Sequence, residues 1–479
     1  MARFFRFLLL LLTLWGSPVS AHSGKARFHL LIDTDGAADD LRTLCLLLSN
    51  REAEVLAVVA SDGVLPPDET ARRVRALLHE FHHEGIPVGL GRTTQATPPA
   101  PRSLAMQTRW APPAADTTPF PAACELLAAC IAGEPERVTV AALGPLTNWS
   151  DLLQSRPELA PRIERILWYD ELSGGFNRRC DSVAARRISR CGVPVEIVSA
   201  DPQRPVPVAR LLDTLATIEN PYARKIVTTH RRQPLEAPCR SHHLAVWDDL
   251  VALRLFAPEL FVCRPAEGSV RHCLLQTTEI APACAAILRG RPDAENRIFY
   301  AFPTAPEHYA ADVAPLIAPI LRRHGASEWR AAVLTNELHG HLGIYATIGV
   351  KMGIRAREYF AIGIDDMAVT SLAGSRPPVS CLNDGLQVAT GGTAGHGLLT
   401  VAEVGAARPE ALFRFKNRTI RLRLKPEIAA RIRDDVQRGV AQYGPDSEPY
   451  WQYVRALALR YWQEFDRHEI FGLTEETEE

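Results

Sequence analysis

The chain has 479 residues, of which 47% are hydrophobic and 23% are charged, so it can bury a sizeable core and is not mainly disordered. Its 54 basic and 55 acidic residues nearly cancel, which argues against a dedicated nucleic-acid binder or anionic-membrane binder. A chain of this length predicts two or three domains.

The first 21 residues have the order of a secretory signal peptide. Arg3 and Arg6 give a positive start, an apolar run covers residues 7–15, and the small residues Val19-Ser20-Ala21 offer a cleavage site. The apolar run is too short to span a bilayer, which takes about 20 residues. We therefore expect an exported protein, periplasmic or secreted, with no membrane attachment after cleavage. An uncleaved anchor is the alternative.

Ten cysteines in an exported chain permit disulfides, but the sequence leaves their pairing open. None forms a CxxC pair, so a four-thiolate zinc module is poorly supported. Cys45 lies in an apolar stretch and is expected to be a small core residue.

Short apolar runs alternate with helical patterns through the first 200 residues, which predicts an α/β fold with a doubly wound, mainly parallel sheet. In residues 68–84 the apolar positions recur at spacings of three and four, which predicts a helix with Arg72, Arg73 and Arg75 on its solvated face. In such sheets ligands bind beyond the carboxyl ends of the strands. The expected strands are 28–33, 54–61, 86–91, 137–144, 162–169 and 194–200.

The rest of the chain divides by composition. Residues 93–121 are rich in Pro, Ala and Thr, which predicts a long loop and a candidate lid. We place the first domain at 26–305, a connecting helical segment at 306–329, and a second, α+β domain at 330–479. Within the last, Pro426 and Glu427 are typical of a helix start after a strand, and a charged, mainly helical tail follows.

Four acids follow the first expected strand within eight residues: Asp33, Asp35, Asp39 and Asp40. Carboxylates this close repel one another when desolvated, and a divalent cation relieves the repulsion. Calcium prefers such oxygen ligands, whereas zinc prefers nitrogen and sulfur. The alternative is that these acids cap a helix or lie solvated in a turn.

Four stretches in order resemble the inosine-uridine preferring nucleoside hydrolases, and the resemblance covers about residues 26–305. The family signature DTDPGxDD is similar to DTDGAADD at 33–40, and GPLTN is found at 144–148. The family stretch FNxxxDPEAA is similar to FNRRCDSVAA at 176–185, and HDPL is similar to WDDL at 247–250.

The resemblance implies a calcium-centred N-ribosyl hydrolase. It implies four calcium ligands, which are the carboxylates of Asp35, Asp40 and Asp248 and the backbone carbonyl of Leu143. It further implies that Asp39 and Asn177 contact ribose hydroxyls and that Asp35 is the catalytic base. Breaking the glycosidic bond builds positive charge on the sugar, which nearby carboxylates stabilise.

Several positions depart from the family pattern. Gly36-Ala37 replaces Pro-Gly, and because a glycine remains we expect the turn to survive. Gly175 stands where the family has a glutamate that contacts the outer sugar hydroxyl. Asp62 lies about where members carry a sugar-binding asparagine. Gly175, together with Trp247 in the last of the four stretches, favours a second hypothesis, in which the N-ribosyl substrate lacks the usual sugar end.

Trp247 replaces the histidine that protonates the leaving base in the family. Tryptophan is not a general acid, and losing such help slows hydrolysis roughly 100- to 10,000-fold without abolishing it. Trp247 either stacks on an aromatic leaving base or is a core residue. His242 and His243 either supply the proton or are solvated.

Residues 330–425 resemble the E-component domain of formylmethanofuran dehydrogenase, whose patterns are HGHxCPG and CxxDaiQxxTGCTxGkG. The chain has HGHLG from His339 and CLNDGLQVATGGTAG from Cys381, with glycines replacing two family cysteines. Histidine and cysteine ligands favour zinc, so His339, His341 and Cys381 form a candidate second metal site. Packing or capping is the alternative role.

We therefore expect an exported, calcium-dependent hydrolase of a nucleoside or related ribosyl compound. The alternative is a non-hydrolysing ribosyl-binding protein with a metal-binding second domain. The expected partner is a small-molecule ribosyl substrate rather than a nucleic acid. The family resemblance also allows a homo-oligomer without fixing how many copies it contains.

Overall fold

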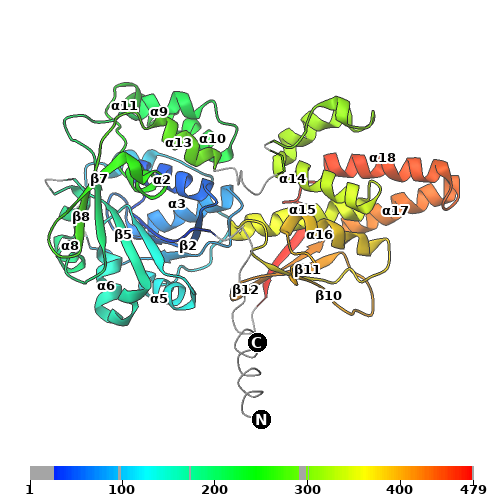
Figure 1. Ribbon diagram of the computed structural model, residues 1–479, viewed down its shortest axis with the longest axis horizontal. Coiled ribbons are helices and arrows are strands. Elements are labelled where there is room, and N and C mark those ends of the chain that lie inside the picture. Colours follow the sequence, from blue (N-terminus) through cyan, green and yellow to red (C-terminus); the bar gives the residue numbers. More distant parts are fainter. Residues whose placement is uncertain (1–25, 95–98, 172–173, 291–297, 300, 477–479) are drawn as a thin grey trace, which may run out of the picture.

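The computed structural model describes residues 26–94, 99–171, 174–290, 298–299 and 301–476. Two lobes lie side by side, the first ending before α14 and the second running from α14 to the C-terminus (Figure 1). The expected signal peptide lies outside the described residues. Within the described part of the chain, no helix combines the length and apolarity that crossing a membrane requires.

The first lobe is built on an eight-stranded sheet with the order β3-β2-β1-β4-β5-β6-β8-β7, parallel except where β7 pairs with β8. All six strands predicted from the sequence are present. The strands are β1 (Phe28–Thr34), β2 (Ala53–Ala60), β3 (Val88–Leu90), β4 (Val138–Ala142), β5 (Ile163–Tyr169), β6 (Val195–Ser199), β7 (Phe261–Pro265) and β8 (Val270–Leu275).

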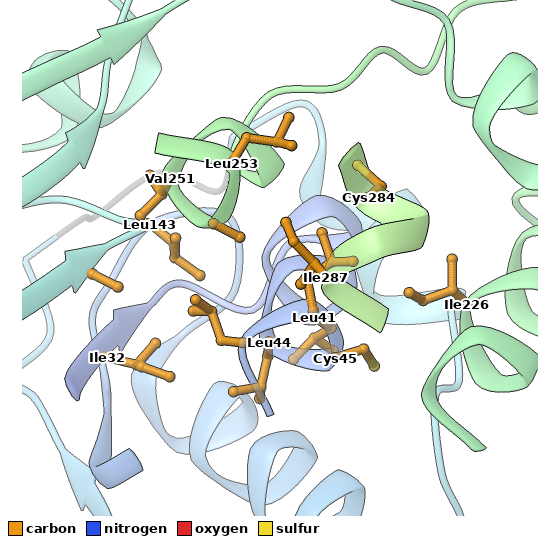
Figure 2. Packing of buried hydrophobic residues seen from close by; sticks show 14 of the residues in the cluster. Ile32, Leu41, Leu44, Cys45, Leu143, Ile226, Val251, Leu253, Cys284 and Ile287 are labelled. Atoms are coloured by element: carbon orange, nitrogen blue, oxygen red, sulfur yellow. The ribbon is translucent and has the colours of Figure 1, made fainter. Parts of the chain in front are cut away.

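Helices cover both faces of this sheet, so the predicted doubly wound fold is confirmed (Figure 1). One face packs against α2 (Ala38–Ser49), α3 (Pro67–Glu80), α9 (Val208–Leu215), α10 (Pro221–His230), α12 (Asp249–Phe256) and α13 (Ala281–Arg289). The other packs against α5 (Ala123–Gly133), α6 (Thr147–Ser155) and α8 (Ser182–Ile188). Along β1, Leu30 and Ile32 join the first core and Leu31 joins the second, as alternating side chains require. Figure 2 shows the first core, with Leu41 and Leu44 of α2 among side chains of α12 and α13.

The strand order places a switch point at β1. Its neighbours β2 and β4 lie on opposite sides, and the chain leaves them toward opposite faces of the sheet. The loops that follow β1 and β4 therefore diverge and leave a ligand-binding place between them, at the carboxyl ends of the strands. The acidic stretch 33–40 lies here.

Strands β7 and β8 were not predicted. They pair antiparallel at the edge of the sheet, and Cys263 and Cys273 face each other across them in a disulfide. Cys45 is free and fully buried in the core, as expected.

The long loop expected at 93–121 contains a short helix, α4 (Arg102–Gln107). The prediction of a solvated face on α3 is wrong for two of its arginines. Arg73 donates to the carbonyls of Ala105 and Thr108, and Arg75 donates to the carbonyl of Thr118. The carbonyls at the end of a short helix lack partners within the helix, and Arg73 supplies donors to them. Together the two arginines hold residues 102–118 against α3.

The second lobe joins a five-stranded sheet, ordered β10-β9-β11-β12-β13, to helices, which confirms the α+β prediction. The strands are β9 (Ala368–Ser371), β10 (Leu399–Val401), β11 (Glu410–Phe415), β12 (Arg418–Leu424) and β13 (Phe471–Glu476). The helices are α14 (Ile317–His339), α15 (Ile344–Phe360), α16 (Leu382–Thr390), α17 (Pro426–Tyr443) and α18 (Glu448–Glu464). Helix α17 starts at Pro426 as predicted, whereas the tail expected to be mainly helical ends in β13.

The two lobes meet at the amino ends of the first sheet's strands. The turn between β11 and β12 inserts Lys416 between Glu54 and Glu134, with which it forms ion pairs. Within the first lobe, His29 Nδ1 lies 3.3 Å from the same Glu134 carboxylate. This contact lies at the end of the sheet opposite to the acidic stretch, so it does not place the second lobe over that stretch.

Candidate functional site

The turn between β1 and α2 shapes the acidic stretch. Gly36 adopts a left-handed conformation with φ of 78°, so the predicted turn does survive the loss of Pro-Gly. A Cβ at Gly36 would lie 2.7 Å from the Thr70 hydroxyl, so the site has no room for a side chain. Asp40 closes the turn, because its Oδ2 accepts from the Thr34 hydroxyl at 2.7 Å and from the Asp35 amide at 2.9 Å.

Asp33 is fully buried beneath the turn. Its two carboxylate oxygens accept from Asn148 Nδ2 at 3.3 and 3.2 Å. Burial raises the pKa of Asp33 to about 8, although the hydrogen bonds from Ser61 and Asn148 oppose the rise. The asparagine of the GPLTN stretch therefore supports the acidic turn from the start of α6, which follows the neighbouring strand β4.

Carboxylates from distant parts of the sequence converge at this turn. One ligand oxygen from each of Asp39, Asp40 and Asp248 lies within 4.8 Å of the others. Asp248 directly precedes α12, more than 200 residues after Asp40. Asp35, expected as a ligand, is not in this converging group, and its carboxylate accepts from the amides of Ala37 and Val64. The structure thus brings together two of the three expected carboxylate ligands, with Asp39 as the third member.

The cluster is electrostatically costly without a counter-ion. Burial, followed by repulsion from neighbouring carboxylates, holds the pKa of Asp40 and of Asp248 well above the ordinary value. Burial also raises the pKa of Asp35 to about 7, with Asp39 and Asp62 adding to the shift. These acids are buried, so the alternative of solvated turn acids does not hold for Asp35 and Asp40.

The donor set fits a hard divalent cation. Asp248 Oδ1 is buried and has no hydrogen-bond partner among the described residues. Asp40 and Asp39 supply further carboxylate oxygens around it. A buried, unpaired carboxylate oxygen is costly unless a donor or a cation compensates it, and an all-oxygen set suits calcium.

Leu143 and Asn177 lie together on the β4 side of the site. Asn177 is 7% exposed, and its Nδ2 donates to the Leu143 carbonyl at 2.8 Å. Asn177 lies in the first turn of α7 (Phe176–Cys180). The two residues are adjacent, as their expected roles of metal ligand and ribose contact require, and those roles stay predictions.

There is no room for a side chain at Gly175, where the family has a glutamate. A Cβ at Gly175 would lie 2.6 Å from Asp170 Oδ1, which accepts from the Gly175 amide at 2.9 Å. Asp170 also forms an ion pair with Arg178, at 2.6 Å. Sequence reasoning missed Asp170 and Arg178; the one available signal was an acid directly after the predicted fifth strand.

Asp62 follows β2 and is 2% exposed. Its Oδ2 accepts from the Thr94 amide at 2.5 Å, and its Oδ1 lies 3.7 Å from Arg102 of α4. Ala105 of the same helix packs against Val64 and Leu65. The expected lid is therefore attached beside the acidic turn.

Trp247 is half-buried and packs against the core, next to Asp248. This position agrees with both roles expected for Trp247, stacking on the leaving base and packing in the core. His242 and His243 are exposed, and His243 Nδ1 lies 2.5 Å from the Ser241 hydroxyl, so the structure gives them no contact with the acidic cluster among the described residues.

The second-lobe site is only partly assembled. Of the described residues, three groups of His, Cys, Asp or Glu converge within 4.8 Å, and His339, His341 and Cys381 are not one of them. His339 Nδ1 instead pairs with Asp384 at 2.7 Å, and its Nε2 lies near Gly343, where the family has a cysteine. The rings of His339 and His341 lie 4.4 Å apart, so the structure brings two of the three expected ligands together, and the zinc site stays a prediction.

The fold and the site together define a doubly wound α/β protein with a cluster of converging carboxylates at its switch point. The model of the inosine-uridine preferring nucleoside hydrolases matches residues 30–285, more than half of the chain. The chain belongs to this family. A second model, described as FmdE, molybdenum formylmethanofuran dehydrogenase operon, matches residues 338–471 and confirms the predicted fusion.

Relatives with curated names share part of this region. The chain is 29% identical over 262 residues to the pyrimidine-specific ribonucleoside hydrolase RihA of Shewanella baltica, covering 49% of this chain and 79% of that one. It is 33% identical over 190 residues to RihA of Klebsiella pneumoniae, covering 36% of this chain and 60% of that one. Among solved structures, a purine-preferring ribonucleoside hydrolase from Gardnerella vaginalis is similar with a TM-score of 0.47 and 13% identity, over 54% of this chain and 97% of that one.

Proposed function

We propose that this protein is an exported, calcium-dependent hydrolase that cleaves the N-glycosidic bond of a ribonucleoside. The observation that carries the proposal is the convergence of Asp39, Asp40 and Asp248 at the switch point, in a chain of the nucleoside hydrolase family. Oxygen ligands from both α2 and the start of α12 would hold the ion. The names of the curated relatives favour pyrimidine ribonucleosides as the first substrates to test.

The residues of the chain would divide the chemistry between them. The ion, when bound, would supply a positive charge that orients the ribose hydroxyls and favours ionised water. Asp35 would accept the proton of the attacking water. The remaining carboxylates would stabilise the oxocarbenium-like sugar, and Asn177 would orient it.

Trp247 limits how the leaving base departs. An indole ring does not donate a proton as an acid at neutral pH, so the substrate's base must leave without it or take the proton from water. We propose that Trp247 stacks on the base, because its side chain is half-buried and directly precedes Asp248 in the chain. This arrangement favours substrates whose bases leave readily.

Export is supported by two independent features. The first 21 residues have the order of a signal peptide. Cys263 and Cys273 form a disulfide between adjacent strands, and disulfides persist mainly in oxidising compartments.

The test is release of free base from a panel of purine and pyrimidine nucleosides, with calcium or with a chelator. We expect turnover that requires calcium and falls at least 100-fold in Asp35→Asn. Asp213→Asn, which changes an acid whose side chain is 86% exposed, is the matched control. Tight nucleoside binding without turnover would instead support the binding-protein alternative, which family membership does not favour.

A further inference from the structure

A buried ion pair lies directly behind the acidic cluster. Arg42 of α2 donates to both oxygens of Asp249, from Nε at 2.6 Å and from Nη2 at 2.5 Å. The two side chains are 1% and 0% exposed. A bidentate pair of this kind fixes distance and orientation, because the planar guanidinium matches the carboxylate at two points.

The pair joins the two elements that carry the cluster. Arg42 is two residues after Asp40 on α2, and Asp249 directly follows Asp248 at the start of α12. Asp249 also stands where the family stretch HDPL has proline, so a charge has been introduced into the motif at this point. The structure shows what this departure does: it links α12 to α2.

Arg42 holds the segment before Asp248 as well. Its Nη1 lies 2.9 Å from His230 Nε2, and its Nη2 donates to the Ala245 carbonyl at 3.3 Å. His230 Nδ1 is bonded to the Ile226 carbonyl at 2.9 Å, which leaves Nε2 as an acceptor for Arg42. One guanidinium therefore contacts α10, the segment before Trp247, and α12.

The cluster needs such a restraint. Its three carboxylates repel one another, and the repulsion acts to separate the start of α2 from the start of α12. A restraint between the first turns of α2 and α12 keeps the carboxylate oxygens close together before an ion binds. Such preorganisation raises the affinity for the ion because less conformational entropy is lost on binding. Apolar contacts between α2 and α12 support the same approach (Figure 2).

We infer that Arg42, through Asp249, is a positioning residue that sets the separation of Asp39 and Asp40 from Asp248 and thereby the affinity of the site for its divalent cation. The inference rests on the proposed function. It does not make Arg42 a catalytic residue, since its guanidinium contacts Asp249, His230 and Ala245 rather than the converging carboxylates.

The test measures calcium affinity by isothermal titration calorimetry on the full chain. Removing one partner alone would leave a buried charge, so the main variant is Arg42→Met/Asp249→Leu, which removes both. Arg42→Lys keeps the charge and loses the two-point contact. The matched control is Arg254→Met/Glu196→Leu, which removes another buried pair, 2.9 Å apart, from the far end of the same helix.

We expect calcium affinity to fall at least tenfold in the double variant and by a smaller factor in Arg42→Lys, as when partners of metal ligands are changed. The control should keep the calcium affinity of the wild type, even if its melting temperature falls by as much as that of the Arg42→Met/Asp249→Leu variant. Affinity within twofold of wild type in both Arg42 variants would overturn the inference and leave the proposed function intact. A wild-type chain that binds no calcium would overturn the proposed function, and the inference with it.

Discussion

Replacing Asp248 by asparagine should raise the stability of the protein without calcium and reduce the stabilisation that calcium adds. The substitution keeps the size of the side chain and removes one of the three converging charges. Without calcium it relieves repulsion with Asp39 and Asp40. With calcium it removes a ligand that the ion needs.

The structure sets the size of the first effect. At a separation of 4.8 Å and an effective dielectric constant of about 20, two like charges repel by about 3.5 kcal/mol. Burial, and then repulsion from neighbouring carboxylates, raises the pKa of Asp40 and of Asp248 well above the ordinary value, which agrees with a costly charged cluster. We therefore expect Asp248→Asn to raise the free energy of unfolding in chelator by about 1–3 kcal/mol at pH 8.

The second effect follows from mass action. Calcium at 100 times its dissociation constant should stabilise the wild type by about 2.7 kcal/mol. The same calcium concentration should stabilise Asp248→Asn by less than half of that, because its affinity is lower.

Urea unfolding at pH 8, in chelator and in calcium, measures both effects. Asp213→Asn is the control because it removes an exposed acid, and it should behave as wild type. The reasoning would be refuted if Asp248→Asn were less stable than wild type in chelator and gained as much from calcium.

Three further predictions concern other parts of the molecule. Trp247→His should speed release of purine bases about tenfold or more, measured as initial rates, because it restores a general acid; an unchanged rate would mean that the ring does not face the leaving base. Cys263→Ser/Cys273→Ser should lower the free energy of unfolding by about 2–3 kcal/mol for a 10-residue loop, and dithiothreitol should then have no further effect. Lys416→Met should weaken the contact between the lobes, seen as faster proteolysis between them. In the wild type the pKa of Glu134 is lowered to about 2, because His29 and Lys416 outweigh burial, so its stabilisation is present above pH 4.5 and is lost as the pH falls toward 2. In Lys416→Met the folded-state pKa should lie closer to 4.5, so the loss should be smaller and should be complete at a higher pH, and an unshifted acid limb would contradict the role of the ion pair.

The sequence alone determined the local parts of this protein. Strands β1 to β6 were predictable because buried parallel strands are short apolar runs, and that signal needs only neighbouring residues. The acidic turn could be located for the same reason, since its acids lie within eight residues of one another. The family resemblance then linked this turn to Asp248.

Only the tertiary structure decided which side chains meet. It brought Asp39 rather than Asp35 into the converging group, placed Arg73 against α4 instead of in solvent, and paired Arg42 with Asp249. Each of these contacts joins elements far apart in the chain, or depends on the direction of a side chain at a turn. Periodicity and spacing record which face of an element is buried, but they hold no information on the partner that covers it, because that partner is chosen by packing and charge compensation across the whole fold.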